Sequence, residues 1–256
     1  MSSYGLWLSA AGMKVNEHRQ TIFANNMANA NTTGFKHDLA VVTQRRVESE
    51  SSLDGALFAS SLFDGLAGGL NVQPTYQDFA QGPIERTDRP LDVAIDGDGF
   101  FAVSDGDATR YTRDGEFALN TAGELVLATE GGRWRVLDES GARISVDEAA
   151  GAASIAQDGT VRQGRNIVAQ LGLFDTQDRQ SLRKLGGNLF DSNGVDMRPI
   201  PGRFAARSRE ESNLEVTKGL VAMIEAARAY QLNATMMQLQ DHTMGQAVST
   251  VGRFAA

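Results

Sequence analysis

The C-terminal segment 213–251 carries the longest regular apolar pattern in the chain, and this pattern constrains the fold more than any other feature. Apolar residues recur there at alternating intervals of four and three, the heptad pattern of a helix that packs along a second helix. Ser212 or Asn213 can cap its start, and Glu215 suits the first turn. Such a helix would extend roughly 57 Å, too far for one small domain to cover. We therefore expect its seam to pack on another helix or on other copies of the chain. The seam, interrupted by Asp241, comprises Val216, Leu220, Met223, Ala227, Tyr230, Ala234, Met237, Met244 and Val248.

A matching but shorter stripe lies at the N-terminus. Counted from Tyr4 at the same intervals, it passes through His18 and turns polar after Ile22. Residues 24–36 are dense in Asn, Thr and Gly, which favour caps and turns, so the helix should end within them. Two narrow seams at opposite ends of a chain are most simply covered by each other, which would bring both termini into one domain. The N-terminal seam comprises Leu8, Ala11, Val15 and Ile22.

Length and composition fit a folded chain without disulfides. The chain has 256 residues, of which 41% are hydrophobic, enough for real cores. It has no cysteine, which excludes thiol catalysis and cysteine-ligated zinc as well. No stretch approaches the ~20 continuous apolar residues of a transmembrane helix. The apolar run 5–13 follows no basic segment and already fits the helical stripe, so we expect neither membrane insertion nor a cleaved signal peptide.

The negative charge is concentrated in the middle of the chain. The formal net charge is −8, whereas residues 1–36 carry +2 and residues 207–256 are neutral, so the middle carries −10. Nucleic-acid binding requires clustered Lys and Arg, which are missing from this pattern, and we predict no nucleic-acid partner. Near-neutral ends suit dense packing against copies of the same chain, because a large like charge would repel.

Proline positions suggest the domain boundaries. All five prolines fall within 74–90 and 199–201, so the terminal segments and the stretch 91–198 contain none. The chain should enter and leave a middle domain at these two windows. The predicted divisions are an N-terminal helix at 1–36, a connecting arm at 37–82, a β-rich domain at 83–203 and a C-terminal helix at 204–256.

The arm combines loop-like and apolar residues. Residues 39–47 could form a strand or a short helix, whereas 49–69 is rich in Ser, Gly and Ala and resembles a weakly ordered loop. It carries too many apolar side chains for a pure linker, and we expect it to become ordered only against a neighbour. These side chains are Leu53, Leu57, Phe58, Leu62, Phe63 and Leu66.

The middle of the chain has the pattern of short strands joined by tight turns. Leu91, Val93 and Ile95 alternate with polar or small residues, and Asp-Gly pairs recur. Asp-Gly and Asn-Gly supply the positive φ that hairpin turns need, so we predict an antiparallel sandwich or small barrel. The fold class is therefore α+β, with paired terminal helices and an inserted antiparallel β-rich domain. The turn pairs are at 96–97, 98–99, 105–106, 114–115, 158–159 and 193–194.

The sequence gives little support to the hypotheses that the chain is an enzyme or binds a metal. Gly97-x-Gly99 follows a strand, as in the dinucleotide fingerprint, but a further strand rather than a helix should follow it. The carboxylates around Asp98 lack the spacing of a calcium loop. His18, His37 and His242 lack the partners of a catalytic or zinc motif, so packing or surface roles are expected. We predict no catalytic residue, no cofactor and no metal.

Four motifs in order across nearly the whole chain carry a family resemblance. The run 25–36, the runs 81–101 and 111–126, and the run 212–230 are similar to the signatures of the bacterial flagellar axial proteins, the rod and hook family. The chain is identified as a member of this family. The motif residues are Asn26, Asn29, Gly34, Phe35, Asp92, Gly97, Gly99, Phe100, Ser212, Asn213, Arg228 and Tyr230.

The resemblance implies a structural role. It implies terminal helices paired in an inner coiled-coil domain, assembly into a helical tube, and partners among copies of the chain and other rod and hook proteins. It also implies export by the flagellar export apparatus to a rod that spans the periplasm. The length resembles that of rod proteins, and a distal-rod-like subunit is favoured over a proximal-rod or hook subunit. A fibre or adhesin subunit is the alternative from another class, but it would need a longer heptad tract or repeated β modules.

Overall fold

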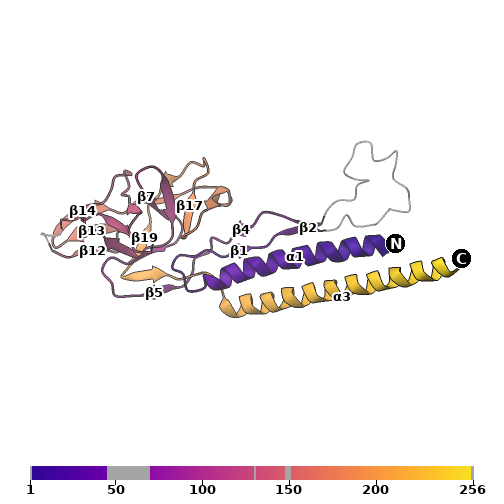
Figure 1. Cartoon of the computed structure of the whole chain (residues 1–256). Coiled ribbons are helices and arrows are strands. Elements are labelled where there is room, and N and C mark those ends of the chain that lie inside the picture. The colour runs from indigo at the N-terminus through magenta and orange to yellow at the C-terminus, as the bar shows by residue number, and fades with distance from the viewer. Residues whose placement is uncertain (1, 45–69, 130, 148–150, 255–256) are drawn as a thin grey trace. The chain divides into compact units, whose positions relative to one another are not determined.

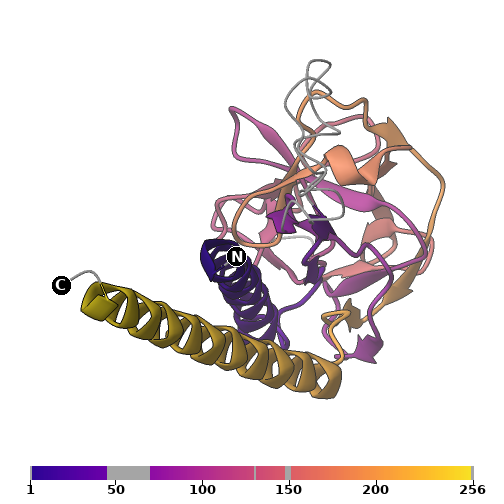
Figure 2. The same ribbon diagram turned by 90° about the vertical axis from the view of Figure 1, so that its right-hand side faces the viewer.

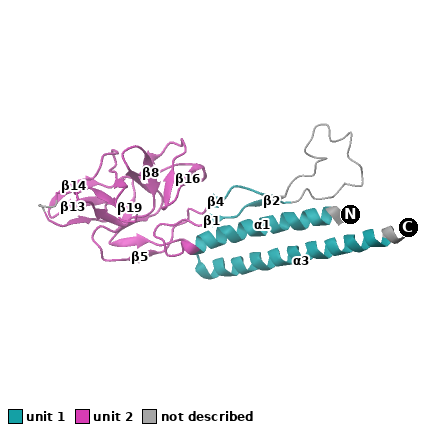
Figure 3. Ribbon diagram, viewed as in Figure 1, with its two compact units in different colours: residues 1–27, 38–76, 215–256 teal, residues 28–37, 77–214 magenta. Residues whose placement is uncertain are grey.

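The computed structural model describes residues 2–44, 70–129, 131–147 and 151–254. The chain divides into two compact units (Figure 3). Unit 1 contains 1–27, 38–76 and 215–256, and unit 2 contains 28–37 and 77–214. The predicted arm segment 49–69 lies outside the described residues.

Unit 1 is built on two long helices that lie side by side. Helix α1 spans Ser2–Ala28 and helix α3 spans Val216–Phe254. They run antiparallel, so that the start of α1 and the end of α3 lie at the same end of the pair (Figures 1 and 2). Helix α1 ends at Ala28, within the run of Asn, Thr and Gly where the sequence predicts an end. The predicted fold class, with paired terminal helices around a β-rich region, is confirmed. Neither described helix is long and apolar enough to cross a membrane.

The start of α3 differs from the predicted cap. Glu215, not Ser212 or Asn213, directly precedes the helix, and its carbonyl accepts a hydrogen bond from Gly219 N at 2.9 Å. Ser212 Oγ accepts from Leu214 N at 3.3 Å. The capping prediction is wrong because the oxygens of Ser212 and Asn213 bind other backbone groups.

Short strands complete unit 1. β2 pairs with β3 in an antiparallel register that sets Val42 opposite Val72, and β1 pairs with β4. In the segment that could have formed either a strand or a helix, the described residues, 39–44, therefore include strand residues and no helical residue. The bounds are β1 Asp38–Leu39, β2 Val42–Gln44, β3 Leu70–Val72 and β4 Tyr76–Gln77.

Unit 2 is a set of antiparallel sheets. The largest has the order β16-β17-β8-β7-β11-β10-β9, with β15 pairing to both β7 and β18. A second sheet has the order β12-β13-β14, and β19 pairs with β6 and β20 with β5. The first strands are β5 Ile84–Arg86, β6 Val93–Asp96, β7 Phe100–Ser104, β8 Thr109–Thr112, β9 Phe117–Leu119, β10 Leu125–Leu127, β11 Arg135–Val136 and β12 Ala153–Ile155. The others are β13 Thr160–Gln163, β14 Asn166–Gln170, β15 Leu173–Asp175, β16 Arg183–Lys184, β17 Leu189–Asp191, β18 Arg198–Pro199, β19 Arg203–Ala206 and β20 Ser208–Glu210.

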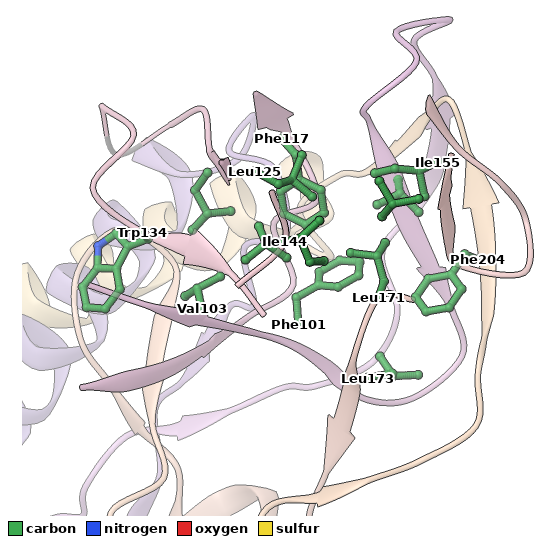
Figure 4. Close-up of a cluster of buried hydrophobic side chains, with 14 of the residues drawn as sticks. Phe101, Val103, Phe117, Leu125, Trp134, Ile144, Ile155, Leu171, Leu173 and Phe204 are labelled. Atoms are coloured by element: carbon green, nitrogen blue, oxygen red, sulfur yellow. The ribbon is translucent and has the colours of Figure 1, made fainter. Parts of the chain in front are cut away.

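The core of unit 2 comes from inward-facing residues of these strands. Phe101 packs edge-on against Phe117 at 5.2 Å and is stacked with Phe204 at 6.1 Å between ring centroids (Figure 4). A second, smaller cluster joins Phe79, Phe100, Phe190 and Leu182. Burying such side chains stabilises each by about 1.5–3 kcal/mol. The first cluster also includes Val103, Leu125, Trp134, Ile144, Ile155, Leu171 and Leu173.

The Asp-Gly pairs serve more than one purpose. Asp105-Gly106 joins the paired strands β7 and β8, and Asp158-Gly159 joins β12 and β13, as hairpins should. Gly97 and Gly99 do have positive φ, but they connect β6 to β7, which lie in different sheets. The turn prediction is wrong at Gly115, whose φ is not positive. A Cβ there would lie 1.7 Å from Val93 O, so this glycine permits close backbone approach instead.

Candidate functional site

Helices α1 and α3 approach each other along faces of small and amide residues. A Cβ built on Gly5 would lie 2.7 Å from Gln240 Nε2, and one built on Gly12 would lie 2.8 Å from Asn233 Oδ1. The glycines are seven residues apart, as are the two amide residues, and their order is reversed. Both contacts therefore belong to one antiparallel heptad register. We call this surface the contact face. We assign to it the buried or half-buried residues that continue the same heptad spacing: Ser9 and Asn16 on α1, and Gly219, Met223, Ala226, Tyr230, Met237 and Met244 on α3.

The residues of the predicted seam are distributed between buried and exposed positions. On α1, Val15 and Ile22 are buried, Ala11 is half-buried and Leu8 is exposed. On α3, Val216, Leu220 and Val248 are exposed. The rest are half-buried: Met223, Ala227, Tyr230, Ala234, Met237 and Met244. The part that these residues play in assembly stays a prediction.

A second apolar surface of α3 is exposed within unit 1. It lies on the opposite side of the helix from the contact face, because its residues occupy the other heptad positions. Its most exposed member is Leu232, at 68% of its full accessible surface. We call it the outer apolar face, and it comprises Val221, Ile224, Leu232, Met236 and Leu239. The exposed residues Arg228 and Thr235 lie among these side chains on the same side of the helix, so the apolar side chains are exposed individually and are accessible to a neighbouring subunit.

Unit 2 contains a buried ionic cluster formed by residues far apart in the sequence. The Glu210 carboxylate accepts hydrogen bonds from Lys36 Nζ at 2.6 Å, Arg113 NH1 at 3.2 Å and Gly82 N at 2.9 Å. Lys36 Nζ also donates to Ala80 O at 2.7 Å. Burial lowers the pKa of Lys36 and of Arg113, and the charge of Glu210 opposes that shift in both. The cluster is thus two buried cations sharing one buried anion.

Asn213 fastens the same region through its amide. Its Oδ1 accepts from His37 N at 2.9 Å, and its Nδ2 donates to Asp78 O at 2.7 Å. The backbone joins in, because Gly34 N donates to Glu210 O at 2.7 Å. Segments 33–37, 78–82 and 208–213 are therefore held together by Asn213 and the ionic cluster.

Two glycines allow these segments to come so close. Gly34 has φ of +68°, and a Cβ on it would lie 2.6 Å from the Arg113 carbonyl carbon. A Cβ on Gly82 would lie 2.1 Å from Glu211 O. Any side chain at either position would have to displace backbone.

Other motif residues hold local structure. In unit 1, Asn26 clamps the backbone of Asp38, donating to its carbonyl at 2.8 Å and accepting from its amide at 2.9 Å. The Asn29 carbonyl accepts from Thr32 N in the turn after α1. In unit 2, the Lys184 ammonium lies 3.9 Å from the centroid of the buried Phe35 ring.

The central motif residues also lie in unit 2. Arg113 lies over the Phe100 ring at 5.4 Å, and Gly97 N donates to Gln81 Oε1 at 3.1 Å. A Cβ on Gly99 would lie 2.7 Å from Leu173 Cγ. On α3, Arg228 is exposed and Tyr230 belongs to the contact face. Motif residues thus occur in both units. Only those of unit 2 take part in the junction around Glu210, by which we mean the packed segments 33–37, 78–82 and 208–213.

A buried carboxyl near this junction has an unusual pKa. Asp114 accepts hydrogen bonds from Glu116 N at 3.0 Å and Thr129 Oγ1 at 2.7 Å. Burial, together with the nearby charges of Glu116 and Asp92, raises its pKa to about 6. Asp92 is buried as well, and its Oδ2 accepts from Thr87 Oγ1 at 2.7 Å.

Asp114→Asn should change how stability depends on pH. A folded-state pKa above the unfolded value means that the folded protein binds more protons, so the stabilisation is present at acid pH and is lost as the pH rises through about 6. From pH 4 to 7.5, the variant should therefore gain on the order of 3 kcal/mol relative to the natural protein. Urea unfolding followed by Trp134 fluorescence at several pH values measures this difference.

Asp158→Asn is the control for that experiment. Hydrogen bonding from Thr160 N lowers the pKa of the exposed Asp158 carboxyl. Its stabilisation is present above the unfolded pKa and is lost as the pH falls, so the difference from the natural protein should run in the opposite direction. Parallel pH profiles for natural protein and Asp114→Asn would contradict the assigned cause.

Within the described ranges, no group of three or more His, Asp and Glu side chains could hold a metal ion. Asp98, considered above for calcium, instead pairs with Arg179 at 2.9 Å. His37 lies 3.7 Å from Asp78 and within the Asn213 clamp, in a packing role.

Several residues of these sites have no counterpart among the predicted site residues. They include Lys36, Arg113, Glu210, Asn233 and Gln240. Arg113 lies in one of the recognised motifs. Lys36 is buried and therefore needs an anionic partner, but the spacing of residues in the sequence does not identify Glu210 as that partner. Asn233 and Gln240 flank Met237 at heptad spacing, which is the one local signal that could have marked them.

Comparison with known proteins gives the same family over most of the chain. Residues 9–36 match the family model of the flagella basal body rod protein, residues 94–163 that of the flagellar hook protein FlgE/F/G D1 domain, and residues 208–250 that of the flagellar basal body rod FlgEFG protein C-terminal. The chain is 35% identical to the flagellar basal-body rod protein FlgF of Caulobacter vibrioides, over 91% of each chain. It is 32% identical to the flagellar basal-body rod protein FlgG of Buchnera aphidicola subsp. Schizaphis graminum, over 93% of this chain and 96% of the relative. FlgG of Bacillus subtilis is 29% identical over 95% and 97% of the two chains.

Proposed function

Because this chain belongs to the flagellar basal-body rod protein family and is a structural rod subunit, not an enzyme, we propose that it assembles through the outer apolar face of α3. The axial rod and hook proteins of this family assemble with one another. In our proposal, copies of this chain and other axial subunits cover that face, and the resulting helical tube transmits torque and lines an export channel.

The observation that supports this role is that the two faces of α3 carry different types of side chain. The contact face toward α1 is made largely of small, amide and methionine residues, whereas larger aliphatic side chains lie on the outer apolar face. Covering a side chain such as Leu232 or Leu239 stabilises an assembly by about 1.5–3 kcal/mol. A tube repeats that gain at every subunit, so stiffness would arise from many equal contacts.

Export and location follow from the same proposal. The subunit would reach a periplasm-spanning rod through the flagellar export apparatus. The near-neutral terminal segments would then pack densely, while the charge of −10 stays in the middle of the chain. A distal-rod-like position stays a prediction.

A photo-crosslinking residue at position 232 tests whether the outer apolar face is covered. Leu232 is largely exposed in unit 1, so a bulky photoreactive side chain there should not disturb the subunit. In basal bodies purified from motile cells, irradiation should join the subunit to a second axial subunit. The same protein, diluted as a monomer, is the matched control and should give no intermolecular product. Absence of such a product from basal bodies would contradict the proposal.

A further inference from the structure

We propose that Asn233 and Gln240 set the antiparallel register of α1 and α3, and thereby decide which face of α3 stays open to neighbours. The register depends only on contacts within unit 1, whereas its consequence for neighbours rests on the proposed function. Both amides lie against glycines of α1, Asn233 at Gly12 and Gln240 at Gly5.

The two contacts are complementary in size. Each glycine leaves room for the end of a longer amide side chain, since a Cβ in its place would come within 3 Å of the amide. Further along the pair, the small residues lie on α3, where Ala226 is buried at 5% exposure. The small residues of the contact face therefore lie on α1 at one end of the helix pair and on α3 at the other. Only one alignment of the two helices places each of them opposite a larger side chain.

Sliding the helices disrupts this match. Moving α3 by seven residues in one direction would set Gln240 over Gly12 but bring Asn233 to the position of Arg19. Moving it seven residues the other way would set Asn233 over Gly5 and carry Gln240 beyond the start of α1. Pairing α3 with a second α3 along the same face would place both amides among Met237 and Met244. Each alternative therefore moves at least one amide away from a glycine that accommodates it.

Asn233 and Gln240 also resemble polar core residues that select one helix register rather than stabilise the helix pair. Asn233 Nδ2 donates to Ala229 O at 2.9 Å on its own helix, which leaves Oδ1 facing Gly12. Gln240 Oε1 is buried and has no hydrogen-bond partner among the described residues. A leucine would avoid that cost. Polar residues at single core positions of coiled coils fix register in this way while lowering stability.

Disulfide trapping measures the register, because the chain has no cysteine of its own. In the full-length monomer, Ser9→Cys with Met237→Cys reports the observed register, and Ser9→Cys with Met244→Cys reports a register shifted by seven residues. The ratio of the first disulfide to the second should be high with the natural amides. In the Asn233→Leu/Gln240→Leu background, it should fall about tenfold or more.

Two further backgrounds separate register from other effects. Gln231→Leu/Gln238→Leu makes the same chemical change at exposed positions and should leave the ratio unchanged. Asn233→Gln/Gln240→Asn keeps both amides and should retain most of the ratio. An unchanged ratio in Asn233→Leu/Gln240→Leu, or an equal fall in the exposed control, would overturn the assignment. Failure of the position-232 crosslink would refute the assembly proposal but leave this ratio as it is.

Discussion

Glu210→Gln should lower the free energy of unfolding of unit 2 by about 3–5 kcal/mol. The glutamine has nearly the same shape, but it removes the one anion that the buried Lys36 and Arg113 share. Two buried like charges then repel each other without a compensating carboxylate. Urea unfolding followed by the fluorescence of Trp134, which is buried in the core of unit 2, measures the loss.

The pH dependence of that variant gives a second, independent signature. Without Glu210, the pKa of Lys36, already lowered by burial, should fall further. A cation whose folded pKa is depressed loses its proton more readily in the folded state, so the unfolding free energy should rise as the pH increases toward the unfolded pKa. Glu210→Gln should therefore recover part of its lost stability between pH 7 and pH 9.5.

Glu211→Gln is the matched control. Its carboxylate is on the adjacent residue and pairs at 3.4 Å with Arg209, where both side chains are more than a third exposed. Exposed pairs contribute only about 0–1 kcal/mol, so this variant should unfold almost like the natural protein. A loss of less than about 1 kcal/mol for Glu210→Gln itself would show that the cluster does not stabilise unit 2 as described.

The ionic cluster also shows where sequence reasoning stops. Lys36 and Glu210 are 174 residues apart in the sequence, and no local spacing relates them. Hydrophobic periodicity finds faces of helices and strands, because those depend on neighbouring residues. A buried ion pair depends on which segments the fold brings together. Its members look like ordinary surface charges until the chain is folded.

The helices show both the strength and the limit of a heptad pattern. The spacing predicted that both terminal helices exist and pair, which the structure confirms. A count of apolar residues alone, however, placed Val216 and Leu220 in the predicted C-terminal seam, and both are exposed. The contact face shares Met223, Tyr230, Met237 and Met244 with the predicted seam. At the intervening heptad positions it uses Ala226, Asn233 and Gln240, each one residue before the predicted seam position.

The reason is that the contact face includes residues that hydropathy does not score as core. Gly219, Asn233 and Gln240 occupy heptad positions, but glycines and amides are not counted as apolar. Turn chemistry behaved similarly in unit 2. The Asp-Gly pairs correctly predicted positive φ at Gly97 and Gly106 but not at Gly115. At Gly115, glycine is required because any Cβ would clash with Val93 O.

Leu232→Asp should abolish rod assembly without unfolding the subunit. The side chain is 68% exposed within unit 1, so the carboxylate stays hydrated in the free subunit. Under a neighbouring subunit, the same carboxylate would be buried without a partner, which costs several kcal/mol. Every subunit in a helical lattice would suffer that cost. The variant should be exported and keep the circular-dichroism spectrum of the natural protein, yet leave cells non-motile.

Two variants isolate the cause of that loss. Gln231→Asp places the same charge on the preceding exposed residue, about 100° around the helix, and should support motility. Leu232→Met keeps an apolar side chain of similar volume and should also support it. Met223→Asp, on the contact face, should instead disturb the pairing of α1 and α3 as well as assembly.

The most direct measurement is therefore to complement a deletion strain with Leu232→Asp and Gln231→Asp, and to examine its basal bodies by electron microscopy. We expect completed rods and motile cells with Gln231→Asp, and no completed rod with Leu232→Asp. Completed rods and normal motility with Leu232→Asp would contradict the claim that neighbouring subunits cover the outer apolar face of α3.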